Sequence, residues 1–462
     1  MKKHIYILIM CIAAIAGTTA RAQVKTGYFT DGYVMAHEMN PALQPESSYM
    51  TVPVLGGTQA GISSSIGMGD ILFEKTDGTL TTFMSKGTID KGELMDKVGD
   101  GVRLNANAQI TLFGMGRRIS DDTFRTLGVT LKTKADAFLP KGLFDCLKDI
   151  ENKDYKIDGM GMKASAYLEI AAGESRKVNR IFSMGAKAKL IIGLVNTNLQ
   201  TDNIELNASS ETAWTAHGHA KLDVSGMRYK KEIKDYGGRQ GGYEQVNGLR
   251  PGGFGIHGTG LAIDGGVTLK PDNHWTFSAA IIDLGFIAWF RSRKAENNGE
   301  TFSFDGFKDI AVEKSDDNSL KNQWNSLHDD LTDLIHLEDK GNRILTEMLG
   351  ATINVGALYH IDRQDKYRIG MLFNSRIEDK YSWWETRINA MAKPFAKTNI
   401  EFCVSPHYST FGTGIGAMVN YMSKSGFSIY LASDRLFTTV NPQMIPTSLN
   451  GAVQIGAAIR IK

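Results

Sequence analysis

The residues of this sequence whose types and spacing could do chemistry are two histidines and a few charged side chains. His217 and His219 stand two positions apart, so their side chains would share one face of a strand, as two metal ligands can. A zinc site needs at least a third donor, and Lys221 and Asp223 nearby do not complete a set. We therefore predict no metal and no cofactor, and interpret these four residues as polar side chains that line an interior.

Asp283 interrupts a regular pattern of apolar residues. In residues 275–281 the odd-numbered positions are apolar, whereas in residues 282–290 the even-numbered positions are apolar. Such an exchange of faces is what a β-bulge produces. Two interpretations remain open. In the first, Asp283 turns inward, where it could lie at a lateral opening or bind a polar head group. In the second, it marks a plain bend together with Gly285. Asp264 is a second acidic candidate on an inward-facing position.

Catalytic motifs are absent from the sequence. It contains no G-x-S-x-G, no H-E-x-x-H, no phosphate loop and no glycine-rich turn in the strand-to-helix context of a dinucleotide fingerprint. The formal net charge is only +2 and 22% of the residues are charged, so the chain lacks the basic excess that nucleic-acid binding requires. We predict no catalytic residues, no enzyme and no nucleic-acid partner. An enzyme housed in a barrel would need clustered Ser, His and acidic residues at its outer rim.

The elements that position these residues are predicted from alternating polarity, the pattern of a strand with one apolar and one polar face. In residues 103–113 the even positions from Leu104 to Leu112 are apolar, and the odd positions from Arg103 to Thr111 are polar. Several such runs hold for about ten residues, the length of a tilted transmembrane strand, whereas soluble strands average about five or six. The alternation recurs in residues 162–171, 182–192, 214–224, 261–270, 352–361, 367–374, 414–421, 427–432 and 453–462.

Connection lengths support a membrane barrel, because outer-membrane barrels alternate short periplasmic turns with long outer loops. We predict about 14–16 strands with both termini in the periplasm; residues 198–207 are counted as one weak strand. The expected short turns are residues 119–122, 173–179, 209–211, 270–274, 362–366, 393–397 and 423–426. The expected long segments are residues 69–99, 135–159, 226–253, 292–350 and 434–450.

The longest connection is predicted to contain a helix at about residues 320–349, where leucines recur mostly every three or four positions. This helical insertion, at about residues 293–350, would pack on the barrel rim or plug the pore.

The first 22 residues predict a cleaved signal peptide. Lys2 and Lys3 precede the apolar run 5–16, and Ala20-Arg21-Ala22 supplies the small residues of a cleavage site. The rest divides into an N-terminal periplasmic or luminal segment (23–47) and the barrel (48–462). No other apolar run approaches the roughly 20 residues of a membrane helix, so a spanning chain must be a closed barrel. The spacing of the two remaining cysteines, residues 146 and 403, does not show whether they pair.

Two stretches resemble known outer-membrane proteins. Asn40-Pro41-Ala42 resembles the Asn-Pro-Ala element near the mature N-terminus of fatty-acid-transporter-like (FadL-type) proteins. Residues 253–289 resemble an uncharacterised Bacteroidetes outer-membrane barrel family of unassigned function. The resemblance implies an all-β, transmembrane, antiparallel up-and-down β-barrel in the Gram-negative outer membrane, and leaves the cargo open. The ending at residues 459–462 departs from the terminal aromatic residue of many such proteins.

Two hypotheses of different classes follow. The first is passive transport of small or amphipathic molecules, with the segment around Asn40, Pro41 and Ala42 folded into the lumen. The second is a structural or docking barrel, the partner of a secretion or surface-anchoring machine. The expected partners are outer-membrane lipid, the barrel assembly machinery and a small amphipathic ligand.

Overall fold

A computed structural model describes residues 25–461, except residues 75–79, 86, 149–152, 208–213, 235–242, 254, 298–301, 305–336, 363, 396–397, 424–425 and 437–449. The expected signal peptide therefore lies outside the described residues. No helix of the described part is long and apolar enough to span a membrane.

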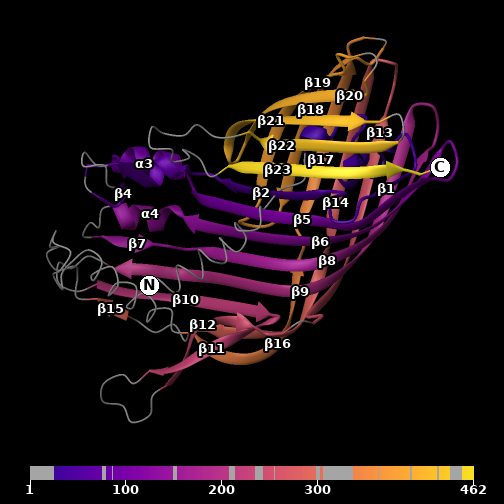
Figure 1. The fold of residues 1–462 in the computed structure, drawn as a ribbon. Helices are drawn as coiled ribbons and strands as arrows, with labels where there is room; N and C mark the ends of the chain where they lie inside the picture. The colour runs from indigo at the N-terminus through magenta and orange to yellow at the C-terminus, as the bar shows by residue number, and fades with distance from the viewer. Residues whose placement is uncertain are drawn as a thin grey trace.

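Strands dominate the described chain (Figure 1). The strands are β1 (Tyr49–Thr51), β2 (Thr58–Ser64), β3 (Leu72–Glu74), β4 (Leu80–Thr82), β5 (Gly101–Arg118), β6 (Thr123–Pro140), β7 (Asp154–Lys156), β8 (Gly161–Lys177), β9 (Phe182–Asn207), β10 (Trp214–Ser225), β11 (Met227–Lys234), β12 (Tyr243–Pro251), β13 (Gly258–Leu269), β14 (Trp275–Glu296), β15 (Phe302–Phe304), β16 (Glu338–Met348), β17 (Ala351–His360), β18 (Tyr367–Ile377), β19 (Trp383–Ala392), β20 (Ile400–Ser409), β21 (Gly412–Met422), β22 (Phe427–Arg435) and β23 (Gly451–Arg460). The helices are the 3-10 turns η1 (Lys25–Gly27) and η2 (Val34–Glu38), and α2 (Met68–Ile71), α3 (Lys91–Val98) and α4 (Lys141–Lys148).

Within the described residues, the strands close an antiparallel barrel of 14 strands. β1 and β2 together form its first strand, which pairs with β5 on one side and with β23 on the other. The remaining strands follow in the order β5, β6, β8, β9, β13, β14, β17, β18, β19, β20, β21, β22 and β23. This confirms the predicted up-and-down barrel, at the lower end of the expected strand number.

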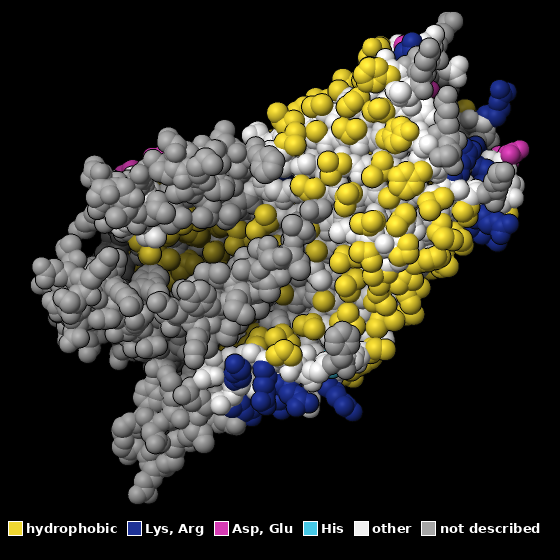
Figure 2. Space-filling view, viewed as in Figure 1, with side chains coloured by type: hydrophobic (Ala, Val, Ile, Leu, Met, Phe, Trp, Pro, Cys, Tyr) yellow, Lys and Arg dark blue, Asp and Glu magenta, His cyan; other side chains and the backbone are white. Residues whose placement is uncertain are grey.

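The barrel wall carries apolar side chains on its exposed outer face, which is the reverse of a soluble protein. In β18, Ile369, Met371 and Phe373 are exposed on the outer face, whereas Arg368 and Leu372, which alternate with them, are buried. Figure 2 shows the same arrangement over the wall, where hydrophobic side chains form a broad outer belt. A soluble protein would bury such a belt, and a barrel in lipid exposes it to the hydrocarbon chains.

The belt gives a stability prediction. Replacing Met371, near the middle of β18, by arginine should destabilise the protein in a bilayer by about 2–4 kcal/mol, because the charge would enter the hydrocarbon region. The matched variant Ile377→Arg, at the end of the same strand, should cost only about 0–1 kcal/mol. Equilibrium unfolding of liposome-inserted protein in urea measures both, and equal losses at the two positions would contradict the depth assignment.

The connections between barrel strands are all short at the end where β5 passes into β6 and β13 into β14. The opposite end carries the long connections, together with short ones at residues 378–382 and 410–411. The predicted turn at residues 209–211 lies outside the described residues. The separate strand predicted at residues 198–207 is wrong, because these residues are the second half of β9. β9 therefore ends on the side of the long connections. We call the two ends of the barrel the short-turn end and the long-loop end.

The wall extends beyond the belt at the long-loop end. β9 has 26 residues, whereas a transmembrane strand needs about 9–11. Its first half pairs with β13 and its second half with β10, so these two strands lie end to end along β9. In the same way, β14 pairs with β17 along its first half and with β16 along its second half.

Two predictions are corrected by this extension. Residues 214–224 do form a strand, β10, but it continues the wall outward and is not one of the 14 barrel strands. Residues 338–348 of the predicted helix form strand β16, whose hydrogen-bonded partner is β14. Pairing with that strand outweighs the weak helical spacing of the leucines. The rest of the predicted helix, residues 320–336, lies outside the described residues.

A small cap stands on the outer ends of β5 and β6. α3 and α4 lie there with β3 and β4, and Phe83, Leu94 and Phe144 pack in a buried cluster between them (Figure 1). Cys146 in α4 is buried and free, as is Cys403 in β20, so the two cysteines do not pair.

Candidate functional site

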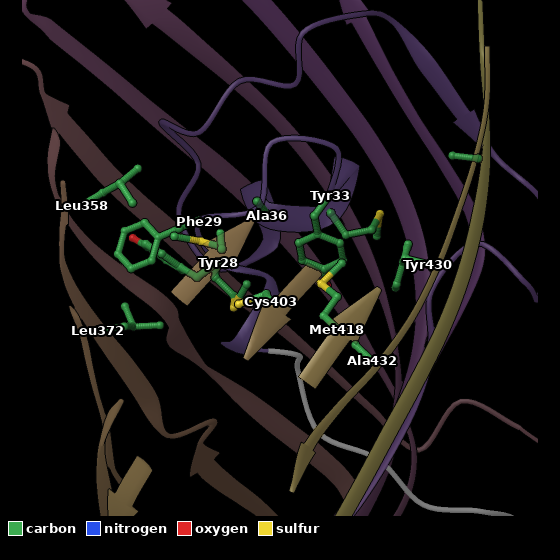
Figure 3. Close-up of a cluster of buried hydrophobic side chains, with 14 of the residues drawn as sticks. Tyr28, Phe29, Tyr33, Ala36, Leu358, Leu372, Cys403, Met418, Tyr430 and Ala432 are labelled. Atoms are coloured by element: carbon green, nitrogen blue, oxygen red, sulfur yellow. The ribbon is translucent and has the colours of Figure 1, made fainter. Parts of the chain in front are cut away.

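The N-terminal segment, residues 25–47, folds into the barrel lumen, and we call it the plug. Its aromatic side chains pack on inward-facing residues of the wall, as Figure 3 shows for Tyr28, Phe29 and Tyr33. Their partners come from several strands and include Leu358, Leu372, Cys403, Met418, Tyr430 and Ala432. The plug is therefore an integral part of the packed interior and not a loose tail.

Glycines in the wall make room for the plug. Gly356 in β17 and Gly370 in β18 both face the Phe29 ring, and an added Cβ would lie 2.8 and 2.6 Å from it. A Cβ at Gly266 in β13 would lie 2.1 Å from Asn40 Oδ1. Real Cβ contacts are not this short, so the wall is shaped to hold this segment.

The predicted Asn40-Pro41-Ala42 element lies in the lumen and is buried. The Asn40 side chain accepts a hydrogen bond from the Ala42 amide (2.9 Å) and donates to the Val267 carbonyl oxygen in β13 (3.3 Å). Asn354 in β17 donates to the Met39 carbonyl oxygen (2.7 Å). The element therefore forms a turn whose polar groups are bonded to two strands of the wall.

The plug is also held by buried ion pairs that sequence analysis did not identify. Arg387 in β19 contacts Glu385 (2.6 Å) and Asp434 (2.9 Å), and donates to the Thr26 hydroxyl (2.8 Å). Asp434 also accepts hydrogen bonds from the Thr26 amide and hydroxyl, at 2.8 and 2.6 Å. Lys25 pairs with Glu385 at 3.2 Å. We call Thr26, Glu385, Arg387 and Asp434 the anchor cluster.

A second ionic contact holds the other side of the plug. Asp31 pairs with Arg368 in β18 and with Lys393, which lies 2.5 Å away. Burial opposes ionisation of Asp31, but the two cations outweigh it and lower the pKa of this carboxyl. Asp31 therefore stays charged, and the contact persists, throughout the neutral range.

His37 lies in a third polar contact between plug and wall. The Lys187 ammonium lies 2.8 Å from His37 Nδ1 and 2.8 Å from a Glu38 oxygen, and His37 Nε2 contacts the Tyr49 hydroxyl. Burial, together with the Lys187 charge, lowers the pKa of His37 below its ordinary value. A neutral ring accepts a hydrogen bond from Lys187 at Nδ1, whereas a protonated ring would direct an N–H at the ammonium.

This contact predicts a pH dependence of plug docking. Because docking lowers the pKa of His37, the docked state is favoured above the unperturbed pKa of about 6.5 and is weakened as the pH falls below it. Modification of an Ala36→Cys variant by an impermeant maleimide, in a background without Cys146 and Cys403, measures exposure of the plug once each rate is divided by that of the urea-unfolded variant at the same pH, because the thiolate fraction itself falls with pH. This normalised rate should be higher at pH 5 than at pH 7.5. The added variant His37→Gln should remove most of that difference; an unchanged difference would exclude His37 as its source.

A cavity occupies the lumen on the long-loop side of the plug. The cavity is open at its mouth, and its empty space together with the solvent there measures about 1120 Å³. Lys25 and Met39 of the plug form part of its floor. Its wall residues belong to the halves of the strands nearer the long-loop end. They are mostly polar or charged and include Asn105, Gln109, Lys132, Lys134, Tyr167, Asp283, Asn354, Asn374, Arg376, Glu385, Asp434 and Arg435.

Asp283 lies at a bulge and its side chain turns inward. Its φ is +59° and the β13–β14 register shifts opposite it, so it marks a bulge, and the exposed face changes there from Phe277 to Leu284 and Phe286. Its side chain also turns inward and lines the cavity. There it contacts Lys189 at 2.5 Å, and the same lysine pairs with the buried Asp264 at 2.7 Å.

The four sequence candidates in β10 do not line this cavity. His217 and His219 lie 3.4 and 3.8 Å from Glu205 and Glu296, in the outward extension of the wall. Asp223 is buried there against Arg343, and Lys221 lies 3.9 Å from Asp223. Across the described residues, no group of three or more His, Cys, Asp or Glu side chains could hold a metal ion.

Comparisons with known proteins place these features in context. A comparison with curated protein sequences gives no match. Among solved structures, a FadL homologue from Pseudomonas aeruginosa is 12% identical, with 94% of each chain covered and a TM-score of 0.41. The toluene transporter TodX of P. putida is 8% identical (96% and 93% covered, TM-score 0.36), and the translocator domain of the autotransporter NalP from Neisseria meningitidis is 8% identical (96% and 99%, TM-score 0.35). These likenesses are too distant to carry an argument about cargo. Residues 41–434 match the model of a family of unknown function, DUF5723, and the chain therefore belongs to that family.

Proposed function

We propose that this protein is a gated channel of the Gram-negative outer membrane, which passes small or amphipathic molecules passively. One observation carries the proposal: a plug and a polar cavity lie one behind the other along the lumen of a barrel with an apolar belt. The cavity admits a solute from the long-loop side, and the plug closes the path toward the short-turn side. Transport then requires that the plug move.

The location follows from general rules for such barrels. The apolar belt needs a membrane, and barrels of this kind keep their short turns in the periplasm and their longer loops outside. The signal peptide (1–22) would direct export and then be cleaved, and the barrel assembly machinery would insert the rest of the chain. The plug then faces the periplasm and the cavity faces the medium.

The cavity chemistry suits a solute with both polar and apolar parts. Lys132 and Arg376 provide positive charge, Asp283 and Glu385 provide negative charge, and Tyr167 adds an aromatic face. Of the sequence candidates, Asp283 lines the cavity, and Asp264 pairs with Lys189, which also contacts Asp283. Asn40, Pro41 and Ala42 belong to the plug. Nothing in this arrangement supplies a nucleophile with an adjacent base, so we propose no enzymatic activity.

Reconstitution tests the proposal. Purified protein in planar bilayers should be nearly closed, with rare openings that become frequent when Thr26→Ala and Asp434→Asn together weaken the anchor cluster. Liposomes containing that double variant should admit small zwitterions and amphipathic solutes faster than wild-type liposomes. A variant that stays folded, releases its plug and still neither conducts nor admits any solute would exclude a transport role.

A docking barrel is the second candidate. Its supporting observation is that the wall and the α3–α4 cap extend well beyond the belt, while the lumen is filled on the short-turn side. Two results together would favour a docking barrel: one partner accompanies the intact protein in stoichiometric amount when it is purified from its native membrane, and the double variant Thr26→Ala with Asp434→Asn does not conduct.

A further inference from the structure

The β11–β12 hairpin lies on the outer face of the extended wall. Met227, in β11, accepts a hydrogen bond at Sδ from the Thr197 hydroxyl in β9 (3.5 Å). Asn198, next to Thr197, points the opposite way and donates to Glu347 (2.7 Å), which also accepts from the buried Trp289 (3.0 Å). Trp289 packs with Tyr167, a residue of the cavity wall, so that direction is inward and Thr197 faces outward.

One face of the hairpin is apolar and packs on the wall. Tyr229 is buried with Val224 and Ala295, and its hydroxyl donates to the carbonyl oxygens of Leu222 and Arg293, each at 2.8 Å. Met227 and Leu249 pack against the same cluster. These contacts orient the hairpin, so that its opposite face points away from the wall.

The other face presents cations without acidic partners. Arg228, Lys230 and Arg250 are exposed, and across the described residues none of the three has an ion pair. Arg228 and Arg250 are direct cross-strand partners, an arrangement in which like charges destabilise the pair. The neighbouring Lys231 is held differently, because it pairs with Asp339 at 3.2 Å. An anion between the two arginines would remove the repulsion.

This basic face begins at the edge of the apolar belt. The base of the hairpin is closed by the hydrogen bond from the Gly252 amide to the Gly226 carbonyl oxygen (3.0 Å). Just below it, Ile256 and Phe290 are exposed, and the Phe290 amide bonds to the His257 carbonyl oxygen (2.7 Å). Figure 2 shows Lys and Arg side chains gathered beside the hydrophobic belt, where Figure 1 places β11, β12 and β16.

We propose that Arg228, Lys230 and Arg250 bind the phosphate groups of a phosphorylated lipid in the leaflet at the long-loop end. The inference rests on the proposed membrane location. A lipid whose acyl chains lie on the exposed belt holds its head group at the level of these side chains, and arginine binds phosphate through two parallel N–H donors. A soluble anion would match the charge but would make no use of the adjoining apolar surface.

The test uses the full chain in nonionic detergent micelles containing lipid A with two phosphates, and counts bound lipid by native mass spectrometry. The double variant Arg228→Gln and Arg250→Gln should bind roughly 25-fold more weakly, since each cation near a membrane surface contributes about fivefold. The matched control, Arg117→Gln with Arg180→Gln, removes two exposed cations at the short-turn end and should bind like wild type. Dephosphorylated lipid A should bind weakly to all three proteins.

Four outcomes would overturn the proposal: unchanged binding in the Arg228/Arg250 variant, an equal loss in the control variant, equal retention of the dephosphorylated lipid, or full displacement by millimolar inorganic phosphate, which would indicate a site for free anions. Heat-modifiable gel migration confirms that each variant is folded. The assay does not involve conductance. If the lipid bound as expected but the barrel did not conduct, the transport role alone would be excluded.

Discussion

Deletion of the plug, residues 25–47, should convert a nearly closed barrel into an open one. Barrels of 16–18 strands leave an aqueous channel, and a barrel of 14 strands approaches that size, so conductance in planar bilayers should rise by roughly tenfold or more once the lumen is cleared. The wall should remain closed, because its strand pairing is independent of the plug apart from contacts at its inner surface.

A matched control keeps the plug but fixes it less well. Gly370→Leu places a side chain where the Phe29 ring now lies, so it should raise the frequency of openings without creating a permanently open pore. A plug deletion that folds and remains as silent as wild type would show that the lumen is closed by something other than this segment.

Replacing Arg387 by alanine should be the most destabilising single change in the lumen. Its side chain is fully buried and lies between Glu385 and Asp434, which are nearly as buried. Removing one partner of a buried ionic group leaves uncompensated charge and typically costs about 3–5 kcal/mol. Urea unfolding of the inserted protein measures the loss, and protease cleavage within the plug reports its release.

Two controls separate charge from geometry in this prediction. Arg387→Lys keeps the charge but loses the forked geometry that serves both carboxylates, so its loss should be smaller. Arg125→Ala removes a cation from an exposed pair with Glu174 (2.8 Å) and should cost far less than Arg387→Ala, because water screens an exposed ion pair. If Arg387→Ala were no worse than Arg125→Ala, the anchor cluster would not stabilise the plugged state.

The barrel could be predicted from sequence because alternation with a period of two reports directly on the two faces of a strand. Residues 103–113 and 367–374 lie in β5 and β18 with the expected polar residues inside, and the exchange of faces at Asp283 is a real bulge. Alternation does not show, however, whether a strand lies within the membrane or in the extension of the wall beyond it. β10 has the same pattern as a barrel strand, yet it lies in the extension beyond β13.

The anchor cluster could not be predicted, because its members are distant in the chain. Thr26 and Asp434 are 408 positions apart, and no local pattern links them. The position of the plug could be anticipated only through the Asn40-Pro41-Ala42 resemblance. A usable signal does exist in β19, where Glu385, Arg387 and Asn389 place three polar groups at alternate positions facing one interior. Such a run of inward polar residues marks a wall that binds something.

Spin labels along β18 test the central claim most directly. Single cysteines at positions 368–374, in a background without Cys146 and Cys403, would be labelled in liposome-inserted protein and compared for collision with oxygen, which is concentrated in lipid, and with a water-soluble nickel complex. Labels at 369, 371 and 373 should meet oxygen freely, and labels at 368, 370, 372 and 374 should be shielded from it. If both sets were equally shielded from lipid, the strand would be packed between protein layers and the chain would not be a membrane barrel.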